Sequence, residues 1–201
     1  MPSILQRSDY EDYLILLYFG RDDDYLSLCQ RRAYRDLQRT LHGIGGLQGA
    51  GDARNQAVKV MTRMFTAIRV MDVTQEKFDD WHRASCAELK AIYKKRGYGS
   101  FYVGQAQKWL NMTFKYLYMM EEQRLPGFSH LYDFCHVPLD QILIDAFRKY
   151  GFRPIKSWSR LNDYEVYLDR QRWVRNQFRL IPLDVEFYLW MGRPLPSDVQ
   201  S

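Results

Sequence analysis

Apolar residues recur at intervals of three and four along most of the chain, the pattern of helices that bury one face. The clearest case is the segment 53–69, whose apolar positions are Ala57, Val60, Met61, Met64, Phe65 and Ile68. The same spacing, with suitable start and stop residues, predicts further helices over 10–19, 25–41, 75–96, 104–123, 138–151, 162–178 and 183–190. No segment shows a run of the strict alternation that half-buried strands have. We therefore expect an all-α protein.

Residues at the ends of these segments agree with the pattern. Thr74 is a favourable N-cap for the helix 75–96, and Lys94, Lys95 and Arg96 suit its C-terminal end, where the helix dipole favours cations. Pro138 suits the first position of the helix 138–151. The glycine-rich stretch 43–51 lacks Gly-Lys-Ser/Thr and follows no strand, so we interpret it as an interhelical loop and not as a phosphate loop.

Composition places the chain among ordinary globular proteins. With 201 residues, of which 46% are hydrophobic and 26% charged, it can form one domain (1–201) or two closely packed lobes. We distinguish an N-terminal helical segment, 1–51, from the remainder, 52–201. The longest apolar or aromatic stretch, 13–19, is far shorter than the ~20 residues that span a bilayer. We therefore expect a cytoplasmic monomer that has no membrane partner.

Charge and cysteine content narrow the possible partners. The chain has 29 basic and 24 acidic residues, a net charge of +5 that suits a polyanion but is common in proteins without one. The helix 25–41 has a basic face formed by Arg31, Arg32, Arg35 and Arg39. Such a face is more often solvated than bound to a ligand, and we interpret it so. Three widely spaced cysteines indicate neither a disulfide framework nor a zinc pair, and His130, Cys135 and His136 lack a second cluster at ligand spacing.

Three segments carry residues suited to chemistry. In the first, a glycine-bearing turn precedes the helix that begins near Gly104 and carries Lys108, and free N–H groups at such a helix start can bind a phosphate. In the second, Pro138 would place Asp140 in the first turn of a helix, where the dipole keeps a carboxylate ionised. In the third, the proline-started helix 183–190 has Glu186 and Trp190 four residues apart, and therefore on one face.

The order of these segments resembles the helix-hairpin-helix DNA glycosylases, whose motif ends in hydrophobic-Pro-Val-Asp before a helix that closes with basic residues and glycine. Here the matching residues run from Val-Pro-Leu-Asp140 to Gly151. The chain is most similar to the archaeal-type 8-oxoguanine DNA glycosylases, because Gln107-Lys108, the 32-residue interval to Asp140 and the segment from Ile181-Pro182 to Leu189-Trp190 occur together. The similarity covers about residues 97–193.

The resemblance implies a helix-hairpin-helix fold of two helical lobes separated by a cleft, with the hairpin at about 97–112. It implies that Lys108 is the nucleophile and Asp140 the catalytic carboxylate of a glycosylase, which can also cleave abasic sites and needs no metal or organic cofactor. Its partner would be DNA that contains a modified base, flipped into a pocket lined by Met112, Glu186 and Trp190.

The residues expected to bind the DNA backbone are Gly104 and Gln105 of this hairpin and the basic residues beside it, Lys94, Lys95 and Arg96. Two positions differ from the family pattern: Glu186 stands where relatives have aspartate, and Met112 where they have an aromatic residue. The base is therefore 8-oxoguanine or another modified base, such as a bulky modified pyrimidine of foreign DNA. The alternative from another class is a helical DNA-binding protein without catalysis, in which Lys108 binds a phosphate and Asp140 only caps a helix.

Overall fold

The computed structural model describes residues 4–46, 48–196 and 199, and in this part of the chain it contains helices and no strands. The α-helices are α1 (Arg7–Phe19), α2 (Tyr25–Gln38), α3 (Ala50–Ile68), α4 (Gln75–Lys95), α5 (Val103–Arg124), α6 (Gln141–Phe147), α7 (Tyr164–Gln177) and α8 (Pro182–Trp190). Short 3-10 helices are η1 (Ile44–Gly46), η2 (Ser129–Phe134), η3 (Arg148–Tyr150) and η4 (Trp158–Arg160). The all-α prediction is therefore confirmed.

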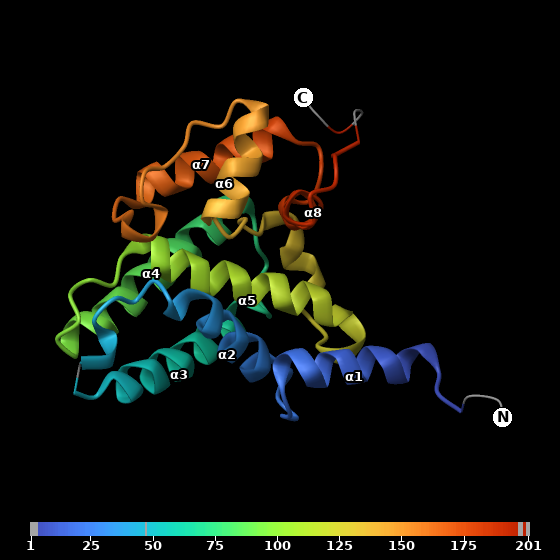
Figure 1. Cartoon of the computed structure of the whole chain (residues 1–201), viewed down its shortest axis with the longest axis horizontal. Coiled ribbons are helices and arrows are strands. Elements are labelled where there is room, and N and C mark those ends of the chain that lie inside the picture. The colour runs from blue at the N-terminus through green and yellow to red at the C-terminus, as the bar shows by residue number, and fades with distance from the viewer. Residues whose placement is uncertain (1–3, 47, 197–198, 200–201) are drawn as a thin grey trace.

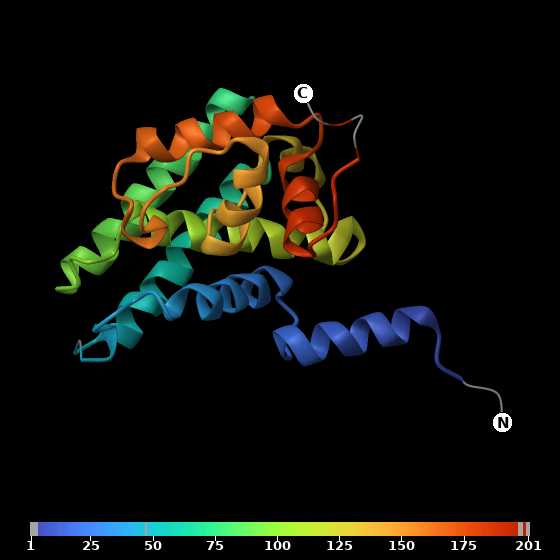
Figure 2. The same cartoon turned by 45° about the horizontal axis from the view of Figure 1, so that its top comes forward.

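α5 lies at the centre of the molecule, with α2 and α3 on one side and α6, α7 and α8 on the other (Figures 1 and 2). Sixteen of its 22 residues are buried, including polar residues that a surface helix would expose. A helix surrounded in this way can present polar side chains from a rigid element to more than one neighbour. The elements around α5 therefore determine which of its side chains reach a pocket.

Buried apolar side chains form two clusters. The larger is built from α2, α3, α4 and α5 together with residues 128–135, and it includes the fully buried Trp109. The smaller is built from α6, α7 and α8 and includes Val103 at the start of α5. Because α2 packs on α3 and α5 within the larger cluster, the segment 1–51 shares its core with residues beyond it.

α1 projects from the rest of the molecule, as both cartoon views show. Its side chains at Leu14 and Leu17 are mostly exposed, whereas Phe19 is buried. Asp12 accepts a hydrogen bond from Arg124 at 2.9 Å, which holds α1 against the end of α5. None of the helices in residues 4–46, 48–196 and 199 is both long enough and apolar enough to span a membrane.

Two sequence predictions at helix ends have different outcomes. Thr74 caps α4 as predicted, since its side chain accepts a hydrogen bond from the Lys77 amide. The prediction that a helix begins at Pro138 is wrong: α6 begins at Gln141, and Asp140 is its N-cap. The residues before Asp140 are extended because they bond to side chains of neighbouring helices, which a sequence pattern cannot reveal.

Candidate active site

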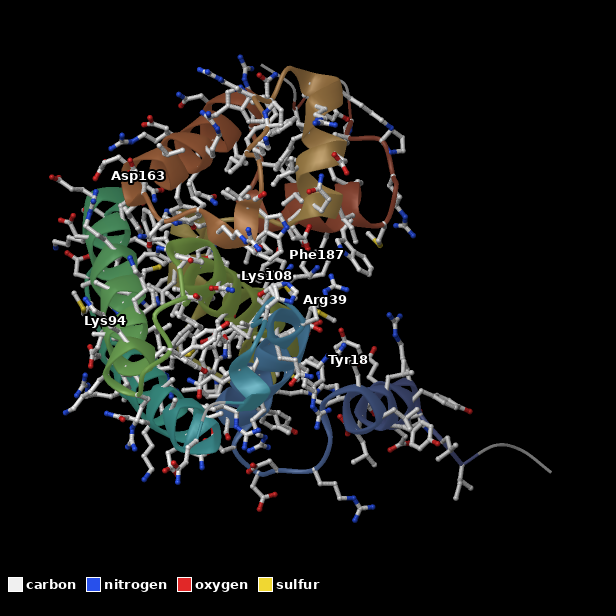
Figure 3. All side chains as sticks on the ribbon, turned by 60° about the vertical axis from the view of Figure 1, so that its left-hand side comes forward. Tyr18, Arg39, Lys94, Lys108, Asp163 and Phe187 are labelled. Atoms are coloured by element: carbon white, nitrogen blue, oxygen red, sulfur yellow. The ribbon has the colours of Figure 1, made fainter. Side chains whose placement is uncertain are left out.

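One face of α5 lines a pocket of about 640 Å³. The residues of this face are Lys108, Met112, Lys115 and Met119, at offsets of four, seven and eleven, the spacing of one helical stripe. Tyr116 of α5 also lines the pocket, and the other walls come from Tyr18 of α1, from α2, from the start of α6 and from α8. Lys108, Asp140, Met112 and Trp190 therefore lie around the same pocket. In Figure 3, Lys108, Arg39 and Phe187 lie close together where these elements meet.

Lys108 and Asp140 form an ion pair in this pocket. Lys108 Nζ donates to Asp140 Oδ2 at 2.5 Å, although Lys108 is only 4% exposed and Asp140 only 6%. The second oxygen, Oδ1, accepts the Leu143 amide at 3.0 Å and so caps α6. Asp140 therefore has two roles, since one carboxylate oxygen caps the N-terminus of α6 and the other pairs with the Lys108 amine.

Gln107 fixes the segment that carries Asp140 against α5. Its side-chain amide donates to the carbonyl of Leu139 at 2.9 Å and accepts the Leu139 amide at 3.2 Å. The same side chain also donates to the carbonyl of Gly104 and accepts from Asn111. Because Lys108 is the next residue on α5, this clamp sets the distance between the amine and the carboxylate.

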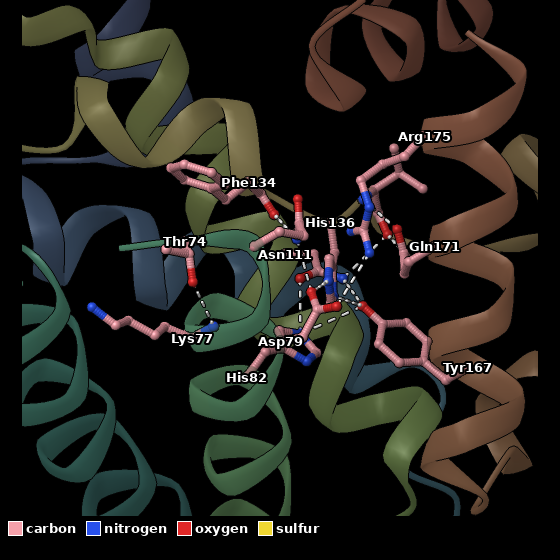
Figure 4. A network of polar contacts seen from close by, with 12 residues as sticks. Thr74, Lys77, Asp79, His82, Asn111, Phe134, His136, Tyr167, Gln171 and Arg175 are labelled. Carbon is pink, nitrogen blue, oxygen red and sulfur yellow. Dashed lines mark hydrogen bonds and ion pairs between the residues drawn. The ribbon is translucent and has the colours of Figure 1, made fainter. Parts of the chain in front are cut away.

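A buried polar network continues behind the clamp (Figure 4). Asn111 donates to the Tyr167 hydroxyl at 2.8 Å, Tyr167 contacts His136 at 2.9 Å, and His136 contacts Asp79 at 2.8 Å. Gln171 adds two hydrogen bonds to the backbone of Val137, at 2.9 Å each. The network therefore joins α4, α5 and α7 to the extended segment before α6.

Burial lowers the pKa of His136, and burial together with the neighbouring His136 holds the pKa of His82 well below its ordinary value. Burial raises the pKa of the Asp79 carboxyl, but its contacts with His136, Gln75 and Arg175 outweigh this and lower it overall. At neutral pH the network therefore contains neutral histidines beside an ionised carboxylate. None of these ionisable groups lines the pocket.

A second buried ion pair lies beside the first. Lys115 Nζ donates to Glu186 Oε1 at 2.7 Å, and the amine also lies over the rings of Phe187 and Trp190, at 4.8 Å and 5.0 Å from their centroids. Trp190 is 52% exposed and so offers part of its ring to the pocket. Lys115 was not predicted from the sequence, although its offset of seven from Lys108 places both on one face.

Glu186 does not line the pocket; it is 1% exposed and lies behind Lys115. Burial raises the pKa of its carboxyl, while the Lys115 ammonium acts in the opposite direction. Its Oε2 meets no hydrogen-bond partner among the described residues. The structure therefore does not support the prediction that Glu186 lines the base pocket, because its carboxylate is buried against Lys115.

The wall formed by α2 is strongly basic. Arg32, Arg35 and Arg39 line the pocket, together with Asp36. Arg32 pairs with Asp36 at 3.3 Å and lies over the Tyr18 ring at 3.9 Å. Arg35 and Arg39 are exposed, as expected of a solvated face, and the packing of α2 beside α5 places all three arginines along the pocket.

The structure does not support the predicted phosphate contacts at Gly104 and Gln105. The Gly104 amide donates to the Leu161 carbonyl at 2.8 Å, and a Cβ at this position would lie 1.9 Å from the Trp158 carbonyl oxygen. Glycine is required there by the close approach of η4. Gln105 is buried and bonds to the Tyr102 amide and the Thr40 carbonyl. Both residues are therefore structural.

Lys94, Lys95 and Arg96 are exposed at the turn between α4 and α5, and none lines the pocket. Figure 3 places Lys94 on a part of the molecule away from Lys108. Arg96 Nη1 lies 3.8 Å from Asp52 Oδ2. The prediction that this turn binds the DNA backbone stays a prediction, and the structure does not bring these residues to the pocket.

His136 and Cys135 are both buried, and His136 already bonds to Asp79 and Tyr167, whereas His130 is exposed. Among the described residues, no group of three or more histidines, cysteines or carboxylates is arranged to hold a metal ion. Comparisons with protein-family models, curated proteins and solved structures find no match to this chain. The arguments that follow therefore depend on the residues of the pocket.

Proposed function

We propose that this protein is a DNA glycosylase of the helix-hairpin-helix type, which flips a modified base out of DNA and excises it. The observation that carries the proposal is the buried pair of Lys108 and Asp140 at 2.5 Å in a pocket that also contains Trp190. A pocket with an amine, a carboxylate and an aromatic ring matches what this reaction needs. The order of the same residues in the sequence is the second support.

The arrangement of helices is compatible with this fold. α4, the turn after it and α5 form a helical hairpin, and the pocket lies where helices of the larger apolar cluster face α6 and α8 of the smaller one. We infer that these two clusters are the two lobes of the fold and that the pocket is the cleft between them. A flipped nucleotide would enter from the exposed side of this cleft.

In the proposed reaction, the neutral Lys108 amine attacks C1′ of the flipped nucleotide, and the bond from C1′ to the base breaks with its electron pair on the base. The Lys108 ammonium loses one proton to solvent before attack, and solvent supplies one to the departing base, so the Asp140 carboxylate keeps its charge. Positive charge develops on the sugar, and an ionised carboxylate within about 3 to 4 Å stabilises it. The C1′–O4′ bond of the adduct then breaks as a proton moves from nitrogen to O4′, which gives a Schiff base. Loss of a C2′ proton and of the 3′ phosphate from this Schiff base would cleave the strand.

The pocket contents also limit the base. Trp190 provides a surface for stacking, worth about 1 to 3 kcal/mol. Lys115, held by Glu186, can donate hydrogen bonds from the other side and so favours a base that presents carbonyl oxygens. Such bases include 8-oxoguanine and modified pyrimidines. Methionine at position 112 leaves a more adaptable wall than an aromatic ring would.

The proposal is tested with two variants and with borohydride, which traps a Schiff base between protein and DNA. The substrates are duplexes with different modified bases and a duplex with a preformed abasic site. We expect the unaltered protein to be trapped covalently on DNA. Lys108→Gln should lose trapping completely, yet its DNA affinity should stay within a few fold of that of the unaltered protein. Lys115→Met should lose base release yet keep trapping at the abasic site, because no base remains to be recognised. Absence of trapping and of base release on every duplex would leave a helical DNA-binding protein without catalysis.

A further inference from the structure

A groove of about 730 Å³ lies between α2 and α3, outside the pocket described above. Ten residues line it and none is acidic, while five are basic: Arg31, Arg32, Arg35, Arg54 and Lys59. In a chain with a net charge of only +5, such a concentration of one sign is a local feature of the surface. Clefts lined by one sign of charge raise the local concentration of the opposite ion.

Three of the five cations carry no ion pair within the described part of the chain. Arg31 pairs with Asp22 at 2.7 Å and Arg32 with Asp36 at 3.3 Å, whereas no carboxylate lies within ion-pair distance of Arg35, Arg54 or Lys59. Their side chains are exposed, so the charges are available to a ligand.

The groove is continuous with the pocket. Arg32 and Arg35, three residues apart on one face of α2, line both. A ligand chain that leaves the pocket over α2 therefore enters the groove directly. The basic face from Arg31 to Arg39 extends about 12 Å along the helix axis, at 1.5 Å per residue. This length corresponds to three or four phosphates of one DNA strand at ~3.4 Å along the duplex axis.

We propose that the groove between α2 and α3 binds the phosphodiester backbone of the DNA strand that carries the flipped nucleotide. The ligand class is a phosphate chain: Arg35, Arg54 and Lys59 contact phosphates, while Asn55 and Gln38 provide further donors along the same path. The inference depends on the proposed function only for the identity of the nucleotide in the pocket. DNA contact in this account comes from α2 and α3, and not from the turn after α4.

The test is the affinity for an unmodified fluorescent duplex, measured by anisotropy over a range of salt concentrations. Arg54→Ala with Lys59→Ala removes two charges that line the groove alone, on exposed positions of α3 where alanine favours the helix. We expect the slope of log affinity against log salt to fall in size by about 1.8, and affinity at 0.1 M salt to fall up to about 60-fold. The matched control is Lys94→Ala with Lys95→Ala, the same change of charge at the turn after α4.

An unchanged slope in the groove variant, or an equal loss in the control, would overturn the inference. Because the duplex is unmodified, the result does not depend on catalysis. Loss of binding in the groove variant, with no base release by the unaltered protein on any duplex, would support the groove and refute the proposed reaction. Base release by the unaltered protein, together with unchanged DNA affinity and salt slope in the groove variant, would support the proposed reaction and refute the groove.

Discussion

Replacing Asp140 by asparagine separates its two roles. The amide oxygen of asparagine can still cap α6 at the Leu143 amide, so the helix start should be retained. What is lost is the negative charge 2.5 Å from the Lys108 amine, in a place where both side chains are almost fully buried. Asparagine therefore removes the electrostatic role and keeps the structural one.

The expected magnitudes follow from this geometry. Removing one partner of a buried ion pair costs about 3 to 5 kcal/mol of unfolding free energy, and the lower end applies because the pocket opens to solvent. Asp140→Ala should cost about 1 kcal/mol more, since it also removes the cap. Loss of the charge opposite the sugar should slow base release by about 10² to 10³ in Asp140→Asn. Urea unfolding measures the first two quantities, and single-turnover base release measures the third.

Glu186→Gln is the matched control, because it removes the carboxylate of the other buried pair in the same region. It should lower stability by a comparable amount, yet trapping at a preformed abasic site should stay within about 10-fold of the unaltered protein. Near-normal base release by Asp140→Asn would refute the reasoning. So would equal slowing of abasic-site trapping in Asp140→Asn and Glu186→Gln. Asp140 would then be a helix cap and nothing more.

Three further variants test other parts of the account. Gln107→Leu leaves the buried amide and carbonyl of Leu139, beside Asp140, unpaired, so the unfolding free energy should fall by about 2 to 5 kcal/mol and trapping should slow. Gln105→Leu should lose stability with trapping intact. Trp190→Ala should slow base release more than about 10-fold with little loss of stability, whereas Tyr188→Ala, one exposed ring outside the pocket, should not. Burial lowers the pKa of His136 in the folded protein, so below about pH 6.5 this side chain binds a proton more readily in the unfolded protein than in the folded one. Stability should thus fall as pH drops below about 6.5, by up to about 1.4 kcal/mol per pH unit, and His136→Gln should flatten this dependence in urea titrations; an unchanged slope would contradict it.

The helices could be predicted from the sequence because their signals are local. The predicted segments 53–69 and 75–96 differ from α3 and α4 by only a few residues, since apolar periodicity and capping residues act within one helix. The start of α6 could not be predicted, because side chains of α5 and α7 hold the residues before Asp140 extended. This is a tertiary effect that overrides the preference of Pro138 for a first turn.

The site divides in the same way. Lys108, Asp140, Met112 and Trp190 were identified by their order in the sequence, and the structure brings them to one pocket. Lys115 could have been found from its offset of seven on the same helix. The basic face of α2 could not, since a basic helix face looks alike whether it meets solvent or a pocket. Only the packing of α2 beside α5 distinguishes the two cases.

The most direct test of the proposed reaction is to map the covalent adduct. The protein is trapped with borohydride on a duplex, the DNA is removed by nucleases, and the modified peptide is sequenced by mass spectrometry. Two amines are buried in the pocket, at Lys108 and Lys115, so the experiment distinguishes them. The account predicts a sugar remnant on Lys108 alone. A remnant on Lys115, or on any other amine, would contradict it.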